Sequence, residues 1–105
     1  MKHTMIRYRT KPEQSEENQR LIEQVFEELH QKAPIGVQYV ALRMDEGVFF
    51  HVVGVAEEGE NPIPALDAFR DFRRDIGARC LEAPVQGRVK VVGSFGVPGW
   101  SATDD

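Results

Sequence analysis

The fold is decided by residues 37–56, which read VQYVALRMDEGVFFHVVGVA. Apolar and β-branched residues fill both halves of this stretch and predict two strands, Val37–Met44 and Val48–Ala56. Asp45-Glu46-Gly47 joins them. A three-residue connection ending in glycine is typical of a hairpin, because glycine accepts the left-handed conformation that such a turn needs. We therefore expect the two strands to pair antiparallel.

Upstream of this hairpin, the sequence predicts one strand and one helix. Residues 4–10 alternate between two sets of side chains, which is the period of a strand. Apolar residues then recur at helical spacing from Leu21 to Leu29. Pro12 suits the first turn of a helix, and Pro34 ends one. We expect a helix over residues 13–32.

Downstream, the pattern predicts a second helix and a last strand. Asn61-Pro62 favours a helix start, because the residue before a proline is extended and an Asn side chain can cap the first turn. The apolar stripe of this helix runs from Ile63 to Ile76, and we expect it to end near Arg79. Asp75 and Arg79, four residues apart, are expected to pair on its exposed face. Residues 85–95 are predicted to form the last strand.

The resulting order of strand, helix, strand, strand, helix, strand is that of a ferredoxin-like α+β fold, βαββαβ. It predicts a four-stranded antiparallel sheet with both helices on one face. We expect residues 1–96 to form the domain and residues 97–105 to form a tail.

The other face of this sheet is expected to carry large apolar side chains. If Tyr8, Val40 and Leu42 face the helices, then Tyr39 lies on the opposite face. The third strand adds one of its two alternating sets, either Phe50 and Val52, or Phe49, His51 and Val53. Both registers leave apolar groups on the free face, which predicts a partner sheet.

Composition argues against several classes of partner and cofactor. Thirteen Lys and Arg against 17 Asp and Glu give a net charge of -4, the wrong sign for nucleic acid. Cys80 is the single cysteine, so no disulfide forms within the chain, and a cytoplasmic location is predicted. Scattered histidines predict no metal site, and dispersed glycines predict no nucleotide-binding loop. The sequence has no run of 18 apolar residues, and so no membrane-spanning helix is predicted.

Three stretches carry a resemblance to a known family. They are Ile6-Arg7-Tyr8-Arg9-Thr10-Lys11-Pro12 ahead of an acidic helix, Phe69-Arg70-Asp71-Phe72 with Ile76, and Val91-Val92-Gly93-Ser94-Phe95. Over residues 3–96 the chain resembles the dimeric α/β-barrel superfamily, and within it the small proteins related to antibiotic-biosynthesis monooxygenases.

This resemblance implies a homodimer whose two sheets pack face to face into a barrel, with a small-molecule pocket between the sheet and the helices of each subunit. Members of the superfamily include cofactor-free oxygenases of polycyclic phenols and haem-degrading oxygenases. The former use a set of Asn, Trp, Tyr and Arg, and the latter use Asn, Trp and a helix-borne His. Here the only tryptophan is Trp100, in the tail, and the second helix has no histidine. No catalytic residue is therefore transferred from either group.

His51 and Tyr8 are the candidates for catalysis. His51 stands in the middle of an apolar strand, where a histidine can serve as a base or as a hydrogen-bond partner for a substrate. The alternative is a structural histidine, paired in the core or at the dimer interface. Tyr8 offers a phenol on the helix-facing side of its strand; its alternative role is core packing.

Four further residues are predicted to bind the substrate. Asn18 extends the apolar stripe of the first helix by one turn, so we expect it to point inward and orient a ligand; the alternative is an ordinary polar helix end. Tyr39 offers a second phenol, which suits a planar phenolic ligand. Phe69 and Phe72 are expected to supply the apolar wall from the second helix.

The leading hypothesis is a homodimer that binds a small aromatic or polycyclic molecule and oxygenates it without a metal or flavin cofactor. The alternative is a binding or structural dimer without turnover. Polar groups that converge on an enclosed cavity would favour chemistry, whereas a pocket filled by Phe26, Phe69 and Phe72 would favour a scaffold.

Overall fold

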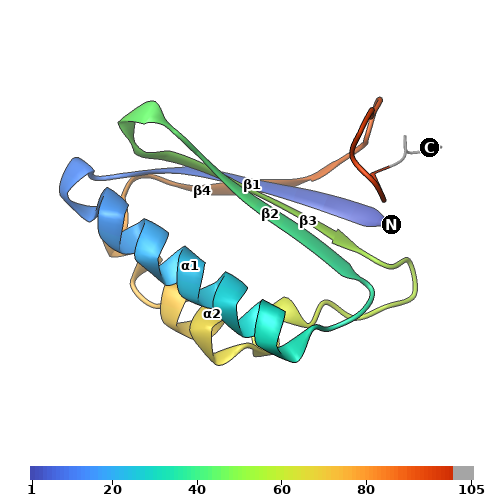
Figure 1. Cartoon of the computed structure of the whole chain (residues 1–105). Helices are drawn as coiled ribbons and strands as arrows, with labels where there is room; N and C mark the ends of the chain where they lie inside the picture. The colour runs from blue at the N-terminus through green and yellow to red at the C-terminus, as the bar shows by residue number, and fades with distance from the viewer. Residues whose placement is uncertain (101–105) are drawn as a thin grey trace.

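Four antiparallel strands form one sheet within residues 1–100, the part of the chain that the computed structural model describes. They are β1 (Lys2–Thr10), β2 (Val37–Met44), β3 (Val48–Val55) and β4 (Cys80–Val89), arranged in the order β2-β3-β1-β4 (Figure 1). The helices are α1 (Ser15–Lys32), α2 (Asp67–Arg73) and the single turn α3 (Ile76–Arg79). The predicted ferredoxin-like sheet is confirmed.

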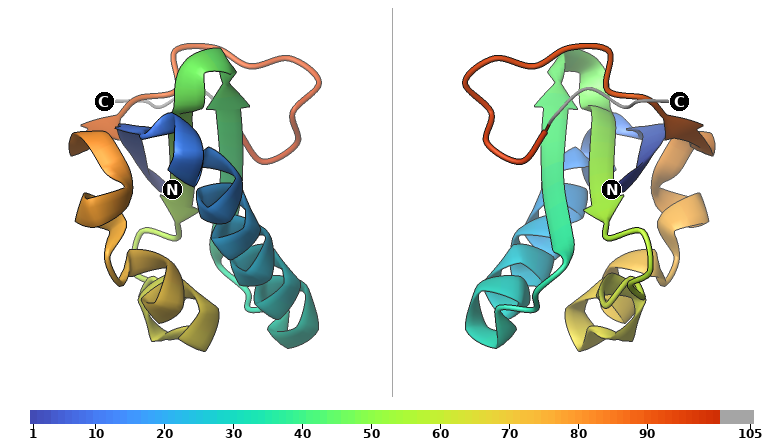
Figure 2. Two further views of the ribbon diagram at one scale, coloured as in Figure 1. Left: turned by 90° about the vertical axis from the view of Figure 1, so that its left-hand side faces the viewer. Right: turned by 90° about the vertical axis from the view of Figure 1, so that its right-hand side faces the viewer.

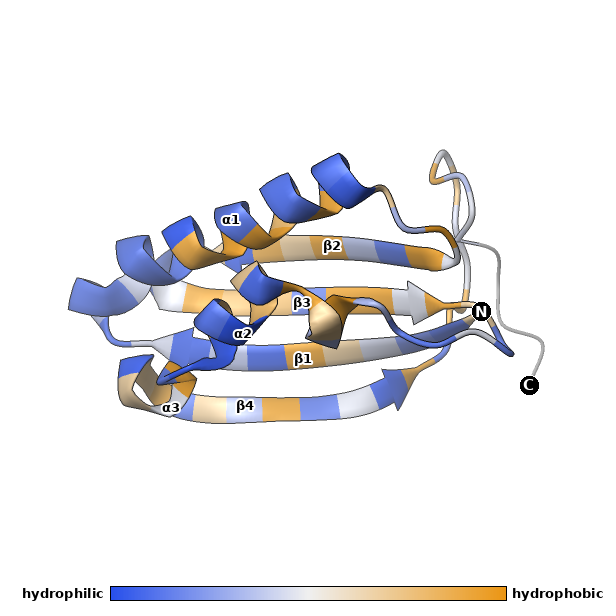
Figure 3. Cartoon of the chain, turned by 90° about the horizontal axis from the view of Figure 1, so that it is seen from below, coloured by the Kyte–Doolittle hydropathy of each residue, from blue (hydrophilic) through white to orange (hydrophobic). Residues whose placement is uncertain are grey.

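All three helices lie on one side of the sheet, and the segment after β4 lies on the other side (Figure 2). The amphipathic pattern of α1 explains its packing, because its apolar side turns toward the sheet and its hydrophilic side turns outward (Figure 3). The core between the layers consists of Tyr8, Ile22, Val25, Phe49, Ile63, Leu66 and Phe72. Within residues 1–100, no helix is both long enough and apolar enough to cross a membrane.

β2 and β3 pair antiparallel through the predicted three-residue turn, with Val37 opposite Val55 and Met44 opposite Val48. Gly47 adopts a φ of 77°, the left-handed conformation expected of it. A side chain at this position would also collide with Thr10 and Ser15, since a Cβ atom placed there would lie 2.9 Å from each of their hydroxyl oxygens. The turn therefore packs tightly against the end of β1 and the start of α1.

The second helix is broken, contrary to the continuous helix that the apolar stripe predicts. Asn61 precedes the first turn, and its Oδ1 accepts a hydrogen bond from the Ile63 N–H at 3.0 Å, but the residue at the N-cap position is Pro62. That turn is a 3-10 turn, and α2 then ends at Arg73. Asp75 adopts a left-handed φ of 62°, which separates α2 from α3. A non-glycine residue in this conformation interrupts the helical hydrogen bonds and turns the chain toward β4.

The predicted last strand, residues 85–95, is shifted. β4 begins at Cys80, pairs with β1 and ends at Val89. Val92 and Phe95 lie outside the sheet and are 93% and 99% exposed. β4 is an edge strand, and an edge strand tolerates polar residues and a proline such as Pro84. Because of these residues, the sequence of β4 lacks the alternation of apolar side chains by which a strand is predicted.

The face of β2 is the reverse of the one expected. Tyr39 and Ala41 pack against the core, whereas Val40 and Leu42 are exposed on the free face. On β3 the set facing the helices is Phe49, His51 and Val53. The free face still carries large apolar groups, though not the set expected on β2, with Met5, Val40, Leu42, Met44 and Val85 all exposed.

The end of the chain returns to the free face. Trp100 lies over His3 of β1, with the ring centroids 4.7 Å apart. Of the predicted tail, residues 97–105, the last five lie outside the described residues.

Candidate functional site

A cavity of about 470 Å³ lies between the sheet and the second helical segment. The sheet contributes polar groups to its wall, from Tyr8, Tyr39 and His51. The helical side contributes mainly apolar groups, among them Ile63, Phe69, Phe72 and Ile76. A mostly apolar cavity with a few convergent polar groups is the usual form of a small-molecule site.

Two tyrosines hold the ring of His51 from both sides. The Tyr39 hydroxyl lies 2.5 Å from Nδ1 of His51, and the Tyr8 hydroxyl lies 2.8 Å from Nε2. His51 itself is only 2% exposed. Both ring nitrogens are therefore hydrogen-bonded to tyrosine hydroxyls, and neither is left to bind a ligand directly.

Strand register explains this arrangement. His51 lies on β3, an inner strand between β2 and β1, and pairs directly with Ala41 and Ile6. Tyr39 and Tyr8 are each two residues from those partners, so the two-residue period of a strand puts both phenols on the same face as the imidazole. Diagonal neighbours of this kind are within reach of long aromatic side chains.

The row of polar groups continues into the helices. Asn18 on α1 is fully buried, and its Nδ2 donates to the Tyr8 hydroxyl at 2.9 Å. Its Oδ1 accepts a hydrogen bond from Nε of Arg79 at 3.1 Å. Five side chains therefore form one row, which we call the buried row, in the order Tyr39, His51, Tyr8, Asn18 and Arg79. Four of them are buried, and Tyr39, at the cavity, is partly buried.

Arg79 is only 6% exposed and is held mainly by neutral acceptors. Its other nitrogens donate to the carbonyls of Phe72 at 2.5 Å and Arg74 at 2.9 Å. Its guanidinium carbon also lies 5.5 Å from the centre of the Phe72 ring. No ion pair within residues 1–100 involves this charge. A buried cation without a carboxylate partner favours negative charge that develops nearby.

Burial sets the protonation of the row. Desolvation lowers the pKa of His51 to about 4, so the imidazole is neutral at pH 7. Burial also raises the pKa of Tyr8 and the pKa of Tyr39 above their usual value, and the Asn18 hydrogen bond opposes this only in part at Tyr8. The resting site thus contains a neutral imidazole between two protonated phenols.

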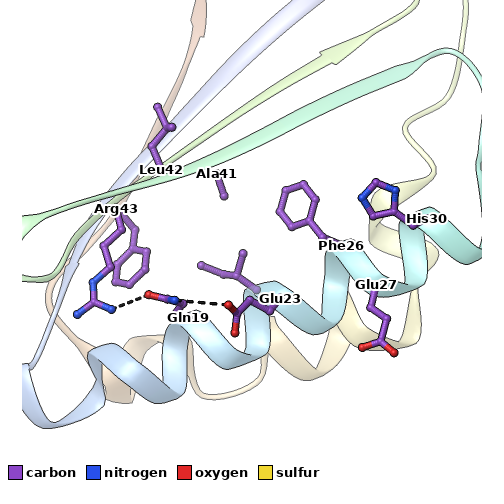
Figure 4. Close-up of a pocket in the computed structure, with 10 residues that line it drawn as sticks. Gln19, Glu23, Phe26, Glu27, His30, Ala41, Leu42 and Arg43 are labelled. Carbon is purple, nitrogen blue, oxygen red and sulfur yellow. Dashed lines mark hydrogen bonds between the residues drawn. The ribbon is translucent and has the colours of Figure 1, made fainter.

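A second hollow, of about 530 Å³, lies between α1 and β2 (Figure 4). Apolar side chains such as Ile22 and Phe26 line its floor, and charged groups line its rim. Arg43 at one end donates to Gln19 at 2.6 Å and to Glu16 at 2.9 Å. Glu23 accepts a hydrogen bond from Gln19 at 3.4 Å. These polar contacts lie at the surface, whereas the other cavity is lined by members of the buried row, and we take that cavity as the candidate site.

The structure brings the predicted site residues together. Tyr8, Tyr39, His51, Phe69 and Phe72 all line one cavity. Asn18 points inward as expected, but it lies behind Tyr8 as its hydrogen-bond partner and does not line the cavity. Arg79 is the member that the sequence missed. Its spacing from Asp75 predicted an exposed ion pair, and this prediction is wrong because the helix breaks at Asp75 and turns Arg79 inward.

The described residues, 1–100, include no group of three or more His, Cys, Asp or Glu side chains that could hold a metal ion. The expectation of a site without metal or cofactor stays a prediction. The groups that are present can form hydrogen bonds, hold an anion and move a proton.

Solved structures share the fold of this chain. A candidate antibiotic biosynthesis monooxygenase from Caulobacter crescentus has a TM-score of 0.68 at 16% identity, over 84% of this chain and 86% of that one. Another from Nitrosomonas europaea has a TM-score of 0.68 at 12% identity, over 84% and 86%. A protein of unknown function from the same organism has a TM-score of 0.70 at 15% identity, over 93% and 95%.

Neither a protein-family model nor a curated protein matches the sequence. At these identities the structural likeness establishes the fold of the single chain, the ferredoxin-like sheet with its helices on one face. It does not carry an activity from those proteins to this one.

Proposed function

We propose that the cavity binds a small planar aromatic molecule and that the protein oxygenates it with O2, without an added cofactor. The observation that carries this proposal is the Tyr39–His51–Tyr8 cluster in the wall of an otherwise mostly apolar cavity. A structural core would be stable with apolar groups at these positions. Buried polar groups that converge on a cavity are typical of a site that handles protons.

The shape of the cavity suits an aromatic ring system. Phe69 and Phe72 lie on its helical side with ring centroids 6.0 Å apart. Tyr8 contacts Phe72, and offset or tilted rings of this kind offer favourable faces and edges to a further aromatic group. A volume of about 470 Å³ is within the range of sites for small organic ligands.

The proposed reaction converts a methylene group of a ring into a carbonyl, so that the methylene and one O2 give one carbonyl and one water. The substrate supplies the four electrons that reduce O2, and its two hydrogens leave as water, so atoms and electrons balance without a further reductant. The first proton leaves to solvent as the substrate anion forms, and the carbanion then bonds to O2. The resulting peroxide takes up a proton, and loss of the second C–H proton with cleavage of the O–O bond gives the carbonyl and water. The site then has to stabilise that anion and supply a proton to the oxygen adduct.

The cluster has groups for both tasks. Tyr39 can hydrogen-bond to an oxygen of the ligand in the cavity that it lines, and His51 connects it to Tyr8. Because the imidazole is neutral, it can pass a proton between the two phenols without carrying a permanent charge. Asn18 orients Tyr8 from behind.

Oxygenation is tested with a panel of polycyclic phenols and ring ketones under 18O2. We expect one 18O atom in the product of at least one compound, and loss of this product in His51→Gln and Tyr39→Phe. Arg43→Gln, in the second hollow, the groove between α1 and β2, is the matched control and should keep the activity.

Binding of ring compounds without 18O incorporation for any of them would contradict the oxygenase and leave a binding protein. Equal product in Tyr39→Phe and wild type would contradict the role of the cluster.

We further propose that a second copy of the chain covers the free face of the sheet. Met5, Val40, Leu42, Met44 and Val85 lie exposed on this face, and Phe50 and Val52 are half-buried among them. Monomers rarely leave so much contiguous apolar surface in water. Two sheets packed through these faces would bury it and close a barrel, as the resemblance implies.

A further inference from the structure

The donors of the buried row all point in one direction, and Arg79 sets that direction. A guanidinium only donates hydrogen bonds, so the Asn18 atom that faces Arg79 Nε at 3.1 Å must be the amide oxygen. The amide nitrogen is then turned toward Tyr8, and it donates to the phenol oxygen at 2.9 Å. The orientation of this amide is thus fixed by chemistry at its other end.

The same reasoning fixes the tautomer of His51. Tyr8 is fully buried and already accepts a hydrogen bond from Asn18. Among the hydrogen bonds of residues 1–100, the one acceptor available to its O–H is Nε2 of His51, at 2.8 Å. Nε2 is therefore an acceptor, and because a neutral imidazole has one N–H, the ring proton lies on Nδ1.

The last step reaches the cavity. Nδ1–H of His51 donates to the Tyr39 oxygen at 2.5 Å. The O–H of Tyr39 then has no acceptor among the hydrogen bonds of the described residues, and Tyr39 lines the cavity. The opposite direction would leave the fully buried O–H of Tyr8 without an acceptor, which folded proteins avoid.

We propose that Arg79 is a positioning residue that directs the Asn18, Tyr8, His51 and Tyr39 donors toward the cavity, so that the site selects aromatic ligands that present an acceptor oxygen, a carbonyl or phenolate, to Tyr39. The choice of ligand rests on the proposed function of this cavity. The direction of the row does not depend on that function: it rests on the contacts of Arg79, Asn18 and Tyr8 and on a neutral His51 ring.

The first arm of the test measures the tautomer of His51 by 15N NMR of the ring nitrogens at pH 7. In the wild type we expect the proton on Nδ1. In Asn18→Asp, a carboxylate would accept from both Arg79 and Tyr8, so Tyr8 would turn its O–H away from His51. The ring proton should then move to Nε2, and the Tyr39 oxygen should become an acceptor toward the cavity.

The second arm compares two planar tricycles of almost equal shape, 9-fluorenone, which only accepts hydrogen bonds, and carbazole, which donates one through N–H. Calorimetry should show wild type binding 9-fluorenone roughly tenfold more tightly, the effect of about one hydrogen bond. Asn18→Asp should bind carbazole more tightly. If that variant does not fold, Tyr8→Phe provides a second test, in which a mixed tautomer and a reduced preference are expected.

Each failure has a different meaning. A wild-type ring proton on Nε2, or a tautomer that neither variant changes, would overturn the directed row even if the protein oxygenates a substrate. A proton on Nδ1 with equal affinity for both tricycles, or with no binding of either, would overturn the ligand class. The expected tautomer and ligand preference without oxygenation of any compound would support this inference and overturn only the oxygenase.

Discussion

Each side of the sheet holds a group of side chains of the kind usually found on the other side. On the helix-covered face, His51 and Asn18 are almost completely buried together with the guanidinium of Arg79. On the free face, Leu42 and Val85 are 54% and 70% exposed. Polar residues inside and apolar residues outside both cost stability in an isolated chain. Neither face is explained by folding alone, and each fits a binding partner: a ligand inside and a second copy outside.

The free face also carries charges that are paired at the surface. Arg7 and Arg9 of β1 both bind Glu82 of β4, at 3.0 and 3.2 Å. This carboxylate holds the two guanidinium groups together at one edge, and the hydrogen bond from Arg7 keeps the pKa of Glu82 below its usual value. The buried guanidinium of Arg79 on the helix-covered side, by contrast, meets neutral acceptors.

The largest effect is expected from removing the apolar wall of the cavity. Phe72 is buried and contacts the rings of Tyr8, His51 and Phe69. Phe72→Ala should lower the free energy of unfolding by about 3–5 kcal/mol, because it leaves a void among these rings. Urea denaturation measures this. Phe95→Ala, which removes an exposed ring, is the control and should leave the stability unchanged; equal losses in both variants would contradict the assigned core.

A smaller effect is expected from protons. The pKa of His51 is about 4 in the folded protein against 6.5 for an exposed histidine, so the unfolded chain binds a proton first as the pH falls. The contribution of His51 to stability is complete above pH 6.5 and is lost toward pH 4, by up to about 3 kcal/mol. Denaturation at several pH values, with His51→Gln as reference, measures it. A variant that loses stability as steeply as the wild type would contradict the buried neutral imidazole.

The free face is tested by placing a charge on it. Leu42→Asp should weaken the dimer about a hundredfold, close to 3 kcal/mol, because a carboxylate would be buried at the interface without a partner. Sedimentation equilibrium should show a dimer for wild type and a monomer for the variant at micromolar concentration. Gln31→Asp, on the exposed side of α1, is the matched control. A wild-type monomer would remove the proposed partner.

The sequence predicted the sheet better than it predicted its faces. The hairpin could be predicted because Gly47 between two β-rich runs is compatible with few other local structures. The orientation of β2 could not be predicted. Val40 and Leu42 point to one face and Tyr39 and Ala41 to the other, and hydrophobicity alone does not show which pair faces the core. The shifted β4 has the same origin, because an edge strand is held by its backbone pairing with β1 and needs no apolar alternation.

The site could be predicted residue by residue but not as a unit. His51, Tyr8 and Asn18 were identified by a polar group in an apolar pattern, and this signal is local. Their mutual contacts depend on register and on helix placement, which a single sequence does not reveal. Arg79 had no such signal, because its spacing of four residues from Asp75 is typical of an exposed ion pair on a helix. The break between α2 and α3, which turns Arg79 inward, depends on tertiary packing.

The smallest effect is expected from a charge pair on the outer surface of α1. Arg20 binds Glu17 at 2.7 Å, but both side chains are about half exposed. Because water screens such pairs, Arg20→Gln should leave the melting temperature unchanged within error. Differential scanning calorimetry checks this. A clear drop in the melting temperature would show that exposed ion pairs also stabilise the fold. It would contradict the distinction between exposed polar contacts and the buried row.

The most direct test of the account is where an aromatic ligand binds. Addition of 9-fluorenone to 15N-labelled wild-type protein should shift the amide signals of Tyr39, His51, Phe69 and Phe72, which surround the cavity beneath α2. Shifts confined to Gln19, Glu23 and Phe26 in the groove of Figure 4, or no shifts at millimolar ligand, would contradict the claim that the buried polar row serves a ligand site.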